Sequence, residues 1–226
     1  MARPDSGKCL SEPGPPENLL VVEGKSDFYV FKGLFLAHGL NGKCRLTEEE
    51  GYEQLRGTID THLLESGLAN IGFVVDGDTD VQARWDSLRD VLLSPRCGYE
   101  ADRVEAAPNP NGVIVEQPGK PRVGLWLMPN NARTGALEDF LGDLVPANDT
   151  LWPYAAACVA GLPTLLPNAT ENWKSKARMY TWLAWQDEPG DPLGLAVRFR
   201  LNPHAEAARP FLGWLRDLFQ LPAPVS

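Results

Sequence analysis

The sequence predicts an α/β fold in which a parallel β-sheet is flanked by helices and followed by a helical C-terminal part. Two observations carry this prediction. Residues 18–23 and residues 70–75 are short apolar runs, and each is followed by a glycine-containing turn and a helical stretch. Strands that alternate with helices in this way are typical of parallel sheets. With 226 residues, 43% of them apolar, the chain can bury a substantial core.

The first expected strand, residues 18–23, is apolar on both faces, as a central parallel strand should be. Gly24 interrupts this strand, and we expect a helix that opens near Ser26 and carries apolar side chains at helical spacing. A second helix is expected over residues 49–68. These elements together form the first strand and crossover of the predicted sheet.

The second expected strand, residues 70–75, leads into an acidic turn at residues 76–80, and a helix over residues 81–93 should follow. Residues 112–116 and 122–128 are expected to be two further strands. The turn between them contains proline and glycine, which favours a hairpin.

The remainder of the chain is predicted to be helical, over residues 135–141, 152–160, 173–185 and 207–219. Residues 1–17 are rich in Pro, Gly and Ser, and we expect them to be a flexible lead-in. Residues 18–145 should form the sheet domain, and residues 146–226 should pack on the same core. No second independent core is expected.

Composition excludes several classes of function. The net charge of −9 argues against a protein that wraps nucleic acid electrostatically, so a nucleic-acid role needs a metal, a local basic strip or a partner. The longest apolar stretch is short and contains prolines, and no signal core follows Met1, so we expect a cytoplasmic protein without membrane insertion. The four cysteines form no CxxC pair, and a zinc site is therefore not expected.

Acidic residues stand where two of the expected strands end. Glu23 ends the first strand, Asp76 ends the second, and Asp78 follows two residues later. Ligands of open parallel sheets bind outside the carboxyl ends of the strands, and hard oxygen ligands suit Mg²⁺ or Mn²⁺. Each acid taken singly is more often a helix cap or an ordinary turn residue. Their combination, with a glycine inside each turn, favours a metal site.

Two segments resemble the motifs of a known domain. Val-Glu-Gly-Lys-Ser-Asp at residues 22–27 resembles the first motif of the Toprim domain, and Asp-Gly-Asp-Thr-Asp at residues 76–80 resembles its DxD motif. Toprim domains occur in topoisomerases, bacterial primases, small ribosomal-RNA maturases and the overcoming-lysogenisation-defect nucleases. Gly-Ala-Leu-Glu-Asp-Phe-Leu at residues 135–141 resembles small Toprim proteins akin to these last nucleases. The resemblance covers residues 18–141 and implies a Toprim, Rossmann-like sheet.

The resemblance implies a nuclease that uses Mg²⁺ or Mn²⁺ to hydrolyse phosphodiester bonds of DNA or RNA, within bacterial anti-phage defence or nucleic-acid processing. Glu23 would be a metal ligand or general acid/base, and Asp76 and Asp78 would be catalytic metal ligands. Asp80 would be an outer ligand. Glu138 would complete the cluster and could support a second cation, although its alternative role is helix solubility.

Four basic residues are candidates for contacts with phosphate. Lys176 is the preferred catalytic lysine, because nucleases of the resembling kind use a lysine after the Toprim core. Lys174, Lys25 and Arg133 are expected to contact phosphate, and a solvated surface role is the alternative for each of the four. Four tryptophans are instead interpreted as core residues rather than base-stacking platforms: Trp85, Trp126, Trp152 and Trp182.

Several alternatives stay open. The chain has no GxxxxGK[ST] motif, so a separate ATPase subunit is a candidate partner, and DNA is favoured over RNA as substrate. A haloacid-dehalogenase-like phosphatase would use Asp76 as nucleophile, but its pattern would begin at that strand. A receiver domain would need an acidic pair at the first strand. A non-catalytic, metal-binding regulatory subunit is the rival from another class. Oligomeric state and target sequence are not predicted.

Overall fold

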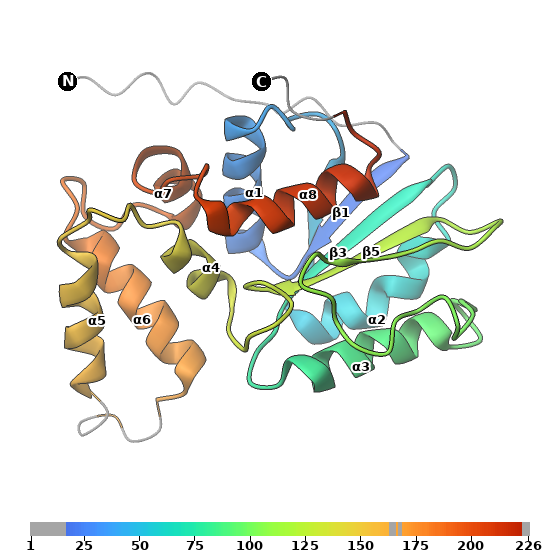
Figure 1. Cartoon of the computed structure of the whole chain (residues 1–226), viewed down its shortest axis with the longest axis horizontal. Coiled ribbons are helices and arrows are strands. Elements are labelled where there is room, and N and C mark those ends of the chain that lie inside the picture. Colours follow the sequence, from blue (N-terminus) through green and yellow to red (C-terminus); the bar gives the residue numbers. More distant parts are fainter. Residues whose placement is uncertain (1–16, 163–165, 167–168, 223–226) are drawn as a thin grey trace.

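A computed structural model describes residues 17–162, 166 and 169–222 of the chain (Figure 1). Residues 1–16, which make up nearly all of the predicted lead-in, lie outside the described residues. The structure confirms the predicted fold class. It is an α/β protein with a five-stranded, mostly parallel sheet that is flanked by helices and followed by a C-terminal helix.

The sheet has the strand order β2-β1-β3-β5-β4. Its strands are β1 (Asn18–Val22), β2 (Arg45–Glu48), β3 (Asn70–Asp76), β4 (Val113–Val115) and β5 (Arg122–Met128). All pairings are parallel except that of β4 with β5, which confirms the predicted hairpin. In the register, Val22 lies opposite both Glu48 and Val74, and Asp76 lies opposite Met128. The carboxyl ends of four strands therefore meet at one edge.

Helices cover both faces of the sheet (Figure 1). On one face, residues of α2 (Tyr52–Leu63) and α3 (Val81–Leu93) form a core cluster with the side chains of β1, β3 and β5 that point to this face. On the other face, α1 (Lys25–Ala37) and α8 (Arg209–Leu218) contribute to a second core cluster. This second cluster also includes residues from five helices that lie between β5 and α8 in the chain: α4 (Leu137–Asp143), α5 (Trp152–Ala160), α6 (Glu171–Ala184), α7 (Leu193–Phe199) and the short helix η2 (Glu206–Ala208).

Glycines let α8 lie directly on the sheet. A Cβ atom at Gly124 of β5 would come within 2.6 Å of Leu218 and 2.7 Å of Trp214, and one at Gly72 of β3 would come within 2.9 Å of Leu218. Both large side chains are almost fully buried, so they could not move aside cheaply. The last helix of the chain thus packs on the predicted sheet domain rather than on a core of its own.

Two elements were not predicted from the sequence, namely β2 and α7. The β2 segment reads Arg-Leu-Thr-Glu and is half-buried at the sheet edge, so it has no apolar run to reveal it. The α7 helix has only seven residues, too few for a helical repeat to stand out. The helix predicted over residues 49–68 is shorter, because Gly51 precedes it with a φ of 98° and it ends at Leu63.

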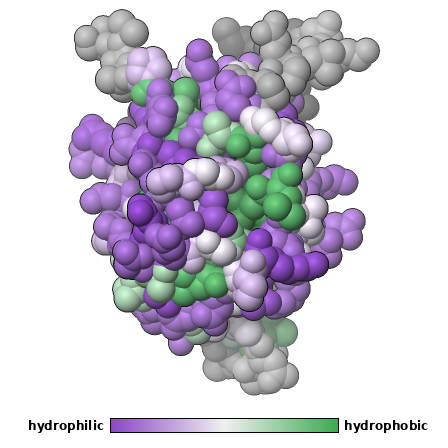
Figure 2. All heavy atoms as spheres, turned by 90° about the vertical axis from the view of Figure 1, so that its right-hand side faces the viewer, coloured by the Kyte–Doolittle hydropathy of each residue, from purple (hydrophilic) through white to green (hydrophobic). Residues whose placement is uncertain are grey.

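The face opposite α5 and α6 is mainly hydrophilic, with apolar atoms in smaller patches among polar ones (Figure 2). Among the residues that the structure describes, no helix is both long enough and apolar enough to cross a membrane.

Candidate functional site

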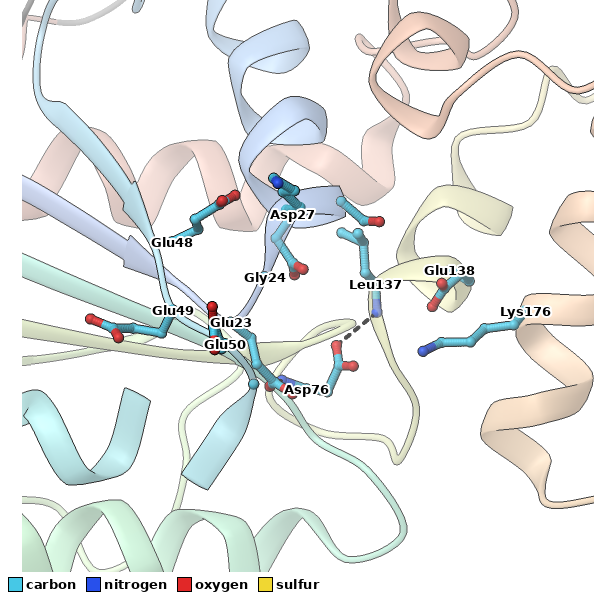
Figure 3. Close-up of a pocket in the computed structure, with 13 residues that line it drawn as sticks. Glu23, Gly24, Asp27, Glu48, Glu49, Glu50, Asp76, Leu137, Glu138 and Lys176 are labelled. Carbon is cyan, nitrogen blue, oxygen red and sulfur yellow. Dashed lines mark hydrogen bonds between the residues drawn. The ribbon is translucent and has the colours of Figure 1, made fainter. Parts of the chain in front are cut away.

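An acidic pocket lies at the carboxyl edge of the sheet, where β1, β2 and β3 end. It has a volume of about 420 Å³. The side chains that matter most for its chemistry come from five elements and the turns beside them: Glu23, Asp27, Glu48, Asp76, Glu138 and Lys176 (Figure 3). Three of the five residues predicted as metal ligands are thus brought together, along with the preferred catalytic lysine.

Glu23 and Asp76 are held by backbone amides. One carboxylate oxygen of Glu23, Oε2, accepts a hydrogen bond of 3.0 Å from the backbone N–H of Asp76. Asp76 Oδ1 in turn accepts one of 2.9 Å from the backbone N–H of Leu137, at the start of α4. Each contact joins segments more than fifty residues apart, so the two acids fix the ends of β1, β3 and α4 relative to one another.

Asp27, on the first turn of α1, points its carboxyl group into the pocket (Figure 3). Burial, followed by repulsion from Glu23, raises the pKa of Asp27 from 3.8 to about 7. Burial and the charges of Glu23, Asp27 and Glu138 also raise the pKa of Asp76 well above its ordinary value. Asp27 belongs to the first motif but was not predicted as a site residue, because sequence spacing does not reveal that it lies on the side of α1 that faces the strand ends.

Glu138 of α4 and Lys176 of α6 line the side of the pocket away from β2 (Figure 3). Glu138 is only 6% exposed, and its burial raises the pKa of its carboxyl group, while the positive charge of Lys176 acts in the other direction. Lys176 extends from α6 toward Asp76 and Glu138 (Figure 3). Among the described residues it makes no ion pair, so its charge is directed at the pocket as a whole rather than at one partner. Burial of Glu138 argues against the alternative that it serves only helix solubility.

The end of β2 adds three glutamates that sequence analysis missed. Glu48, Glu49 and Glu50 all line the pocket. Oε2 of Glu48 is buried and has no hydrogen-bond partner in the described part of the chain. Glu49 instead points away from the pocket and pairs with His62 at 2.8 Å (Figure 3). The run of acids was visible in the sequence, but only recognition of β2 as a strand beside β1 could have connected it to Glu23.

Asp78 and Asp80 do not join the other predicted ligands. Asp78 has a φ of 53°, and its backbone N–H and carbonyl both pair with Gly135. This left-handed turn directs its carboxylate to Arg84, at 2.8 Å, and to the Asn172 side chain, at 2.5 Å. The expected extended turn, with both acids aimed at one cation, is therefore not what the structure has. Asp80 instead caps α3, with Oδ1 accepting a 2.9 Å hydrogen bond from the backbone N–H of Ala83.

The turn that separates Asp76 from Asp78 is tightly packed. A Cβ atom at Gly77 would come within 2.6 Å of the backbone oxygen of Met128, at the end of β5. The N–H of Gly77 donates a 2.9 Å hydrogen bond to the same oxygen. Glycine is required here because the backbone must approach the neighbouring strand closely.

Of the other three residues predicted to contact phosphate, one lines the pocket and two do not. Lys25 lines the acidic pocket. Lys174 pairs with Glu171 of its own helix at 2.6 Å, and Arg133 pairs with Asp143. Neither Lys174 nor Arg133 lines the pocket, so the structure does not bring them to the predicted site.

Two polar contacts hold α6 over the sheet edge. Asn172 reaches Asp78, and Ser175 Oγ donates a 2.6 Å hydrogen bond to Asp139, which also accepts from the backbone N–H of Ala136 at 2.9 Å. Because Lys176 follows Ser175 directly, these contacts determine where the lysine enters the pocket. Asp139 therefore acts as a structural partner of α6.

The donor set fits a hard divalent cation in kind, since it consists of carboxylate oxygens with no cysteine or histidine. The pKa values of Asp27 and Asp76 are raised first by burial and then by the neighbouring carboxylates, and a bound cation would offset both effects. Within residues 17–162, 166 and 169–222, however, no three acidic, His or Cys side chains converge closely enough to hold a metal ion. Glu23, Asp27, Asp76 and Glu138 would have to draw together to bind one.

Residues 17–220 match the model of a family described as a protein of unknown function, DUF3226, and the chain belongs to this family. The match includes every residue of the acidic pocket. No curated protein and no solved structure matches the chain significantly.

Proposed function

We propose that this member of the DUF3226 family is a nuclease that hydrolyses phosphodiester bonds of DNA or RNA with Mg²⁺ or Mn²⁺ bound in the acidic pocket. One observation carries the proposal. Glu23, Asp27, Asp76 and Glu138 crowd at the carboxyl edge of a parallel sheet, where ligands of such sheets bind, and the pKa of three of them is raised by burial. Repulsion between acidic side chains that share one pocket lowers the free energy of unfolding unless a bound cation offsets their charge.

The residues of the pocket suit different tasks. A bound divalent cation would offset the charge between the carboxylates and a substrate phosphate and would supply Lewis acidity. Glu23, Asp76 and Glu138 would hold it, with Asp27 beside them. Lys176 would contact a phosphate oxygen on which negative charge develops, because its ammonium group enters the pocket without an ion-pair partner among the described residues. Lys25 would contact a phosphate group of the nucleic-acid backbone.

The Toprim resemblance of residues 22–27 and 76–80 supports the same reaction, and with it a role in anti-phage defence or nucleic-acid processing in the cytoplasm. DNA is favoured over RNA, and a separate ATPase subunit is a candidate partner. Asp78 and Asp80 take no part in metal binding in this proposal, since their carboxylates are engaged by Arg84, Asn172 and the start of α3.

The test is cleavage of supercoiled plasmid, single-stranded DNA and RNA by the purified protein in Mg²⁺, Mn²⁺ or EDTA. Glu23→Ala and Asp76→Ala should both abolish metal-dependent cutting, and Asp80→Ala is the matched acidic control that should keep it. Cutting that persists in EDTA or in both pocket variants would refute the proposal. Absence of cutting together with absence of Mg²⁺ binding by calorimetry would refute it as well.

A second candidate is a metal-binding regulatory subunit without catalysis of its own. The net charge of −9 favours it, because an acidic protein is repelled by the phosphates of a nucleic-acid substrate. Mg²⁺ binding at the pocket without cutting of any substrate would support this candidate. A phosphatase with Asp76 as nucleophile is less well supported, because Asp78, the second acid of the DxD motif that such an enzyme would use, is engaged by Arg84 and Asn172.

A further inference from the structure

Two large aromatic side chains are exposed on α6, the helix that carries Lys176. Trp173 is 39% exposed and Tyr180 is 47% exposed. This distinguishes them from Trp85, Trp126 and Trp182, which are buried as predicted for core residues. Large apolar faces are costly to leave in water, so aromatic residues exposed beside a candidate active site point to a ligand with a flat apolar surface.

The exposed aromatic residues flank Lys176 along the helix. Residues 173, 176 and 180 are spaced i, i+3 and i+7, which places them on one side of α6. The side that packs into the core carries Ser175, Met179 and Trp182 instead. Since Lys176 reaches into the acidic pocket (Figure 3), Trp173 and Tyr180 lie along the helix surface on either side of the entry point of the lysine.

Charge on α6 is opposite to that of the whole chain. The helix has three basic residues and one acidic residue, a surplus of two positive charges, whereas the protein has a net charge of −9. Lys174 pairs with Glu171, and Arg178 lies 3.9 Å from Asp139, so among the described residues Lys176 is the positive charge of this helix that is left for a phosphate. A lysine that lies between two exposed aromatic rings on one side of a helix suits a single strand, with the cation near a phosphate and the rings against bases.

We propose that Trp173 and Tyr180 stack on unpaired bases of a single-stranded nucleic acid whose phosphate lies at the acidic pocket. The inference rests on the proposed function and narrows its substrate class. In a duplex both faces of a base are covered by its neighbours, so an exposed indole ring gains little from duplex DNA. Every base has a free face in a single strand, and the contact therefore does not depend on sequence.

The test measures binding, by fluorescence anisotropy, of a short labelled single strand and of the same sequence as a hairpin duplex, with Ca²⁺ present and strand integrity checked on a gel. Trp173→Ala should weaken single-strand binding by roughly fivefold to a hundredfold, the worth of one stacked base. Trp173→Phe should recover most of it, and duplex binding should change by less than about twofold. The matched controls are Trp185→Ala, which removes a similarly exposed indole (41%) at the far end of α6, and Tyr154→Ala on α5.

The outcomes separate this inference from the nuclease proposal. If single-strand binding depends on Trp173 but no substrate is cut, the inference stands and the nuclease proposal fails. If substrates are cut but Trp173→Ala and Trp185→Ala behave alike, the nuclease stands and the inference is overturned. It is also overturned if the wild-type protein binds no single strand, or if Trp173→Ala changes only the oligomeric state.

Discussion

Asp76 and Asp78 are two residues apart in the chain, yet their surroundings are opposite. Asp76 lies among the carboxyl groups of Glu23, Asp27 and Glu138, with a backbone N–H of Leu137 as its hydrogen-bond donor. Asp78 is held between the guanidinium group of Arg84 and the amide of Asn172, and its side chain is 42% exposed. The second acid is neutralised by the protein, whereas the first is left to be neutralised by a proton or a cation. The charged groups around each carboxylate, rather than its position in the DxD motif, therefore decide which of the two acids is available to bind a cation.

The largest expected difference between the two acids is in catalysis. Asp76→Asn keeps the shape of the side chain and an oxygen for the Leu137 N–H but removes the charge, so cleavage should fall by about a thousandfold, equivalent to several kcal/mol. Asp78→Asn should lower cleavage by less than about tenfold, because it affects only the placement of α6. Initial rates on the substrate that the wild type cuts would check this, and equal losses in both variants would break the comparison.

The second largest expected effect is on the free energy of unfolding and its dependence on pH. The pKa of Asp27 is 3.8 in the absence of the fold and about 7 in the folded protein. Between these pH values the carboxyl group is protonated in the folded state and ionised in the unfolded state. The free energy of unfolding therefore decreases as pH rises from 3.8 to about 7. In EDTA, Asp27→Asn should therefore be more stable than the wild type at pH 8, by about 2 to 4 kcal/mol.

The same variant should gain much less at pH 5, where the Asp27 carboxyl group of the folded wild type is still protonated. Urea unfolding at the two pH values would measure the difference. Asp78→Asn is the control, and it should show no stabilisation at pH 8, because it loses a salt bridge instead of relieving repulsion. A pH-independent effect of Asp27→Asn would show that repulsion in the pocket is not its cause.

Binding of Mg²⁺ should produce a smaller gain in stability. At a free concentration ten times its dissociation constant, Mg²⁺ should add about 1.4 kcal/mol to the free energy of unfolding of the wild type. The gain should disappear in Asp76→Asn and persist in Asp78→Asn. Thermal unfolding with and without Mg²⁺ would check this, with Na⁺ at equal ionic strength as the control for screening. A gain that persists in Asp76→Asn would place the cation elsewhere.

The smallest expected effect belongs to the contact that holds α6 near Asp78. Asn172→Ala removes the hydrogen bond to a charged acceptor and should lower the free energy of unfolding by about 1 kcal/mol. Asn202→Ala is the control for loss of an amide, since the Asn202 side chain accepts a hydrogen bond from the backbone N–H of His204 and makes no contact with Asp78. An Asn172→Ala protein as stable as the wild type would mean that Arg84 alone satisfies Asp78.

Sequence patterns predicted those parts of the molecule whose signals are local. The apolar runs at β1, β3 and β5 and the helix α3 lie where they were expected, because full burial on both faces leaves an uninterrupted apolar run and a helix leaves a regular repeat. Glu23, Asp76, Glu138 and Lys176 were predicted as site residues, and they line one pocket. Edge strand β2 escaped prediction, and with it the contribution of Glu48.

The sequence alone predicted the buried strands, the longer helices and the acids at the ends of β1 and β3, since all of these leave signals among neighbours in the chain. Only the tertiary structure decided which acids face one another. The left-handed backbone at Asp78, tied to Gly135 by paired hydrogen bonds, turns that carboxylate toward Arg84, and α1 brings Asp27 to the position beside Asp76. The charge that an acid experiences is set by groups within a few ångströms in space, and these come from segments that no spacing rule connects.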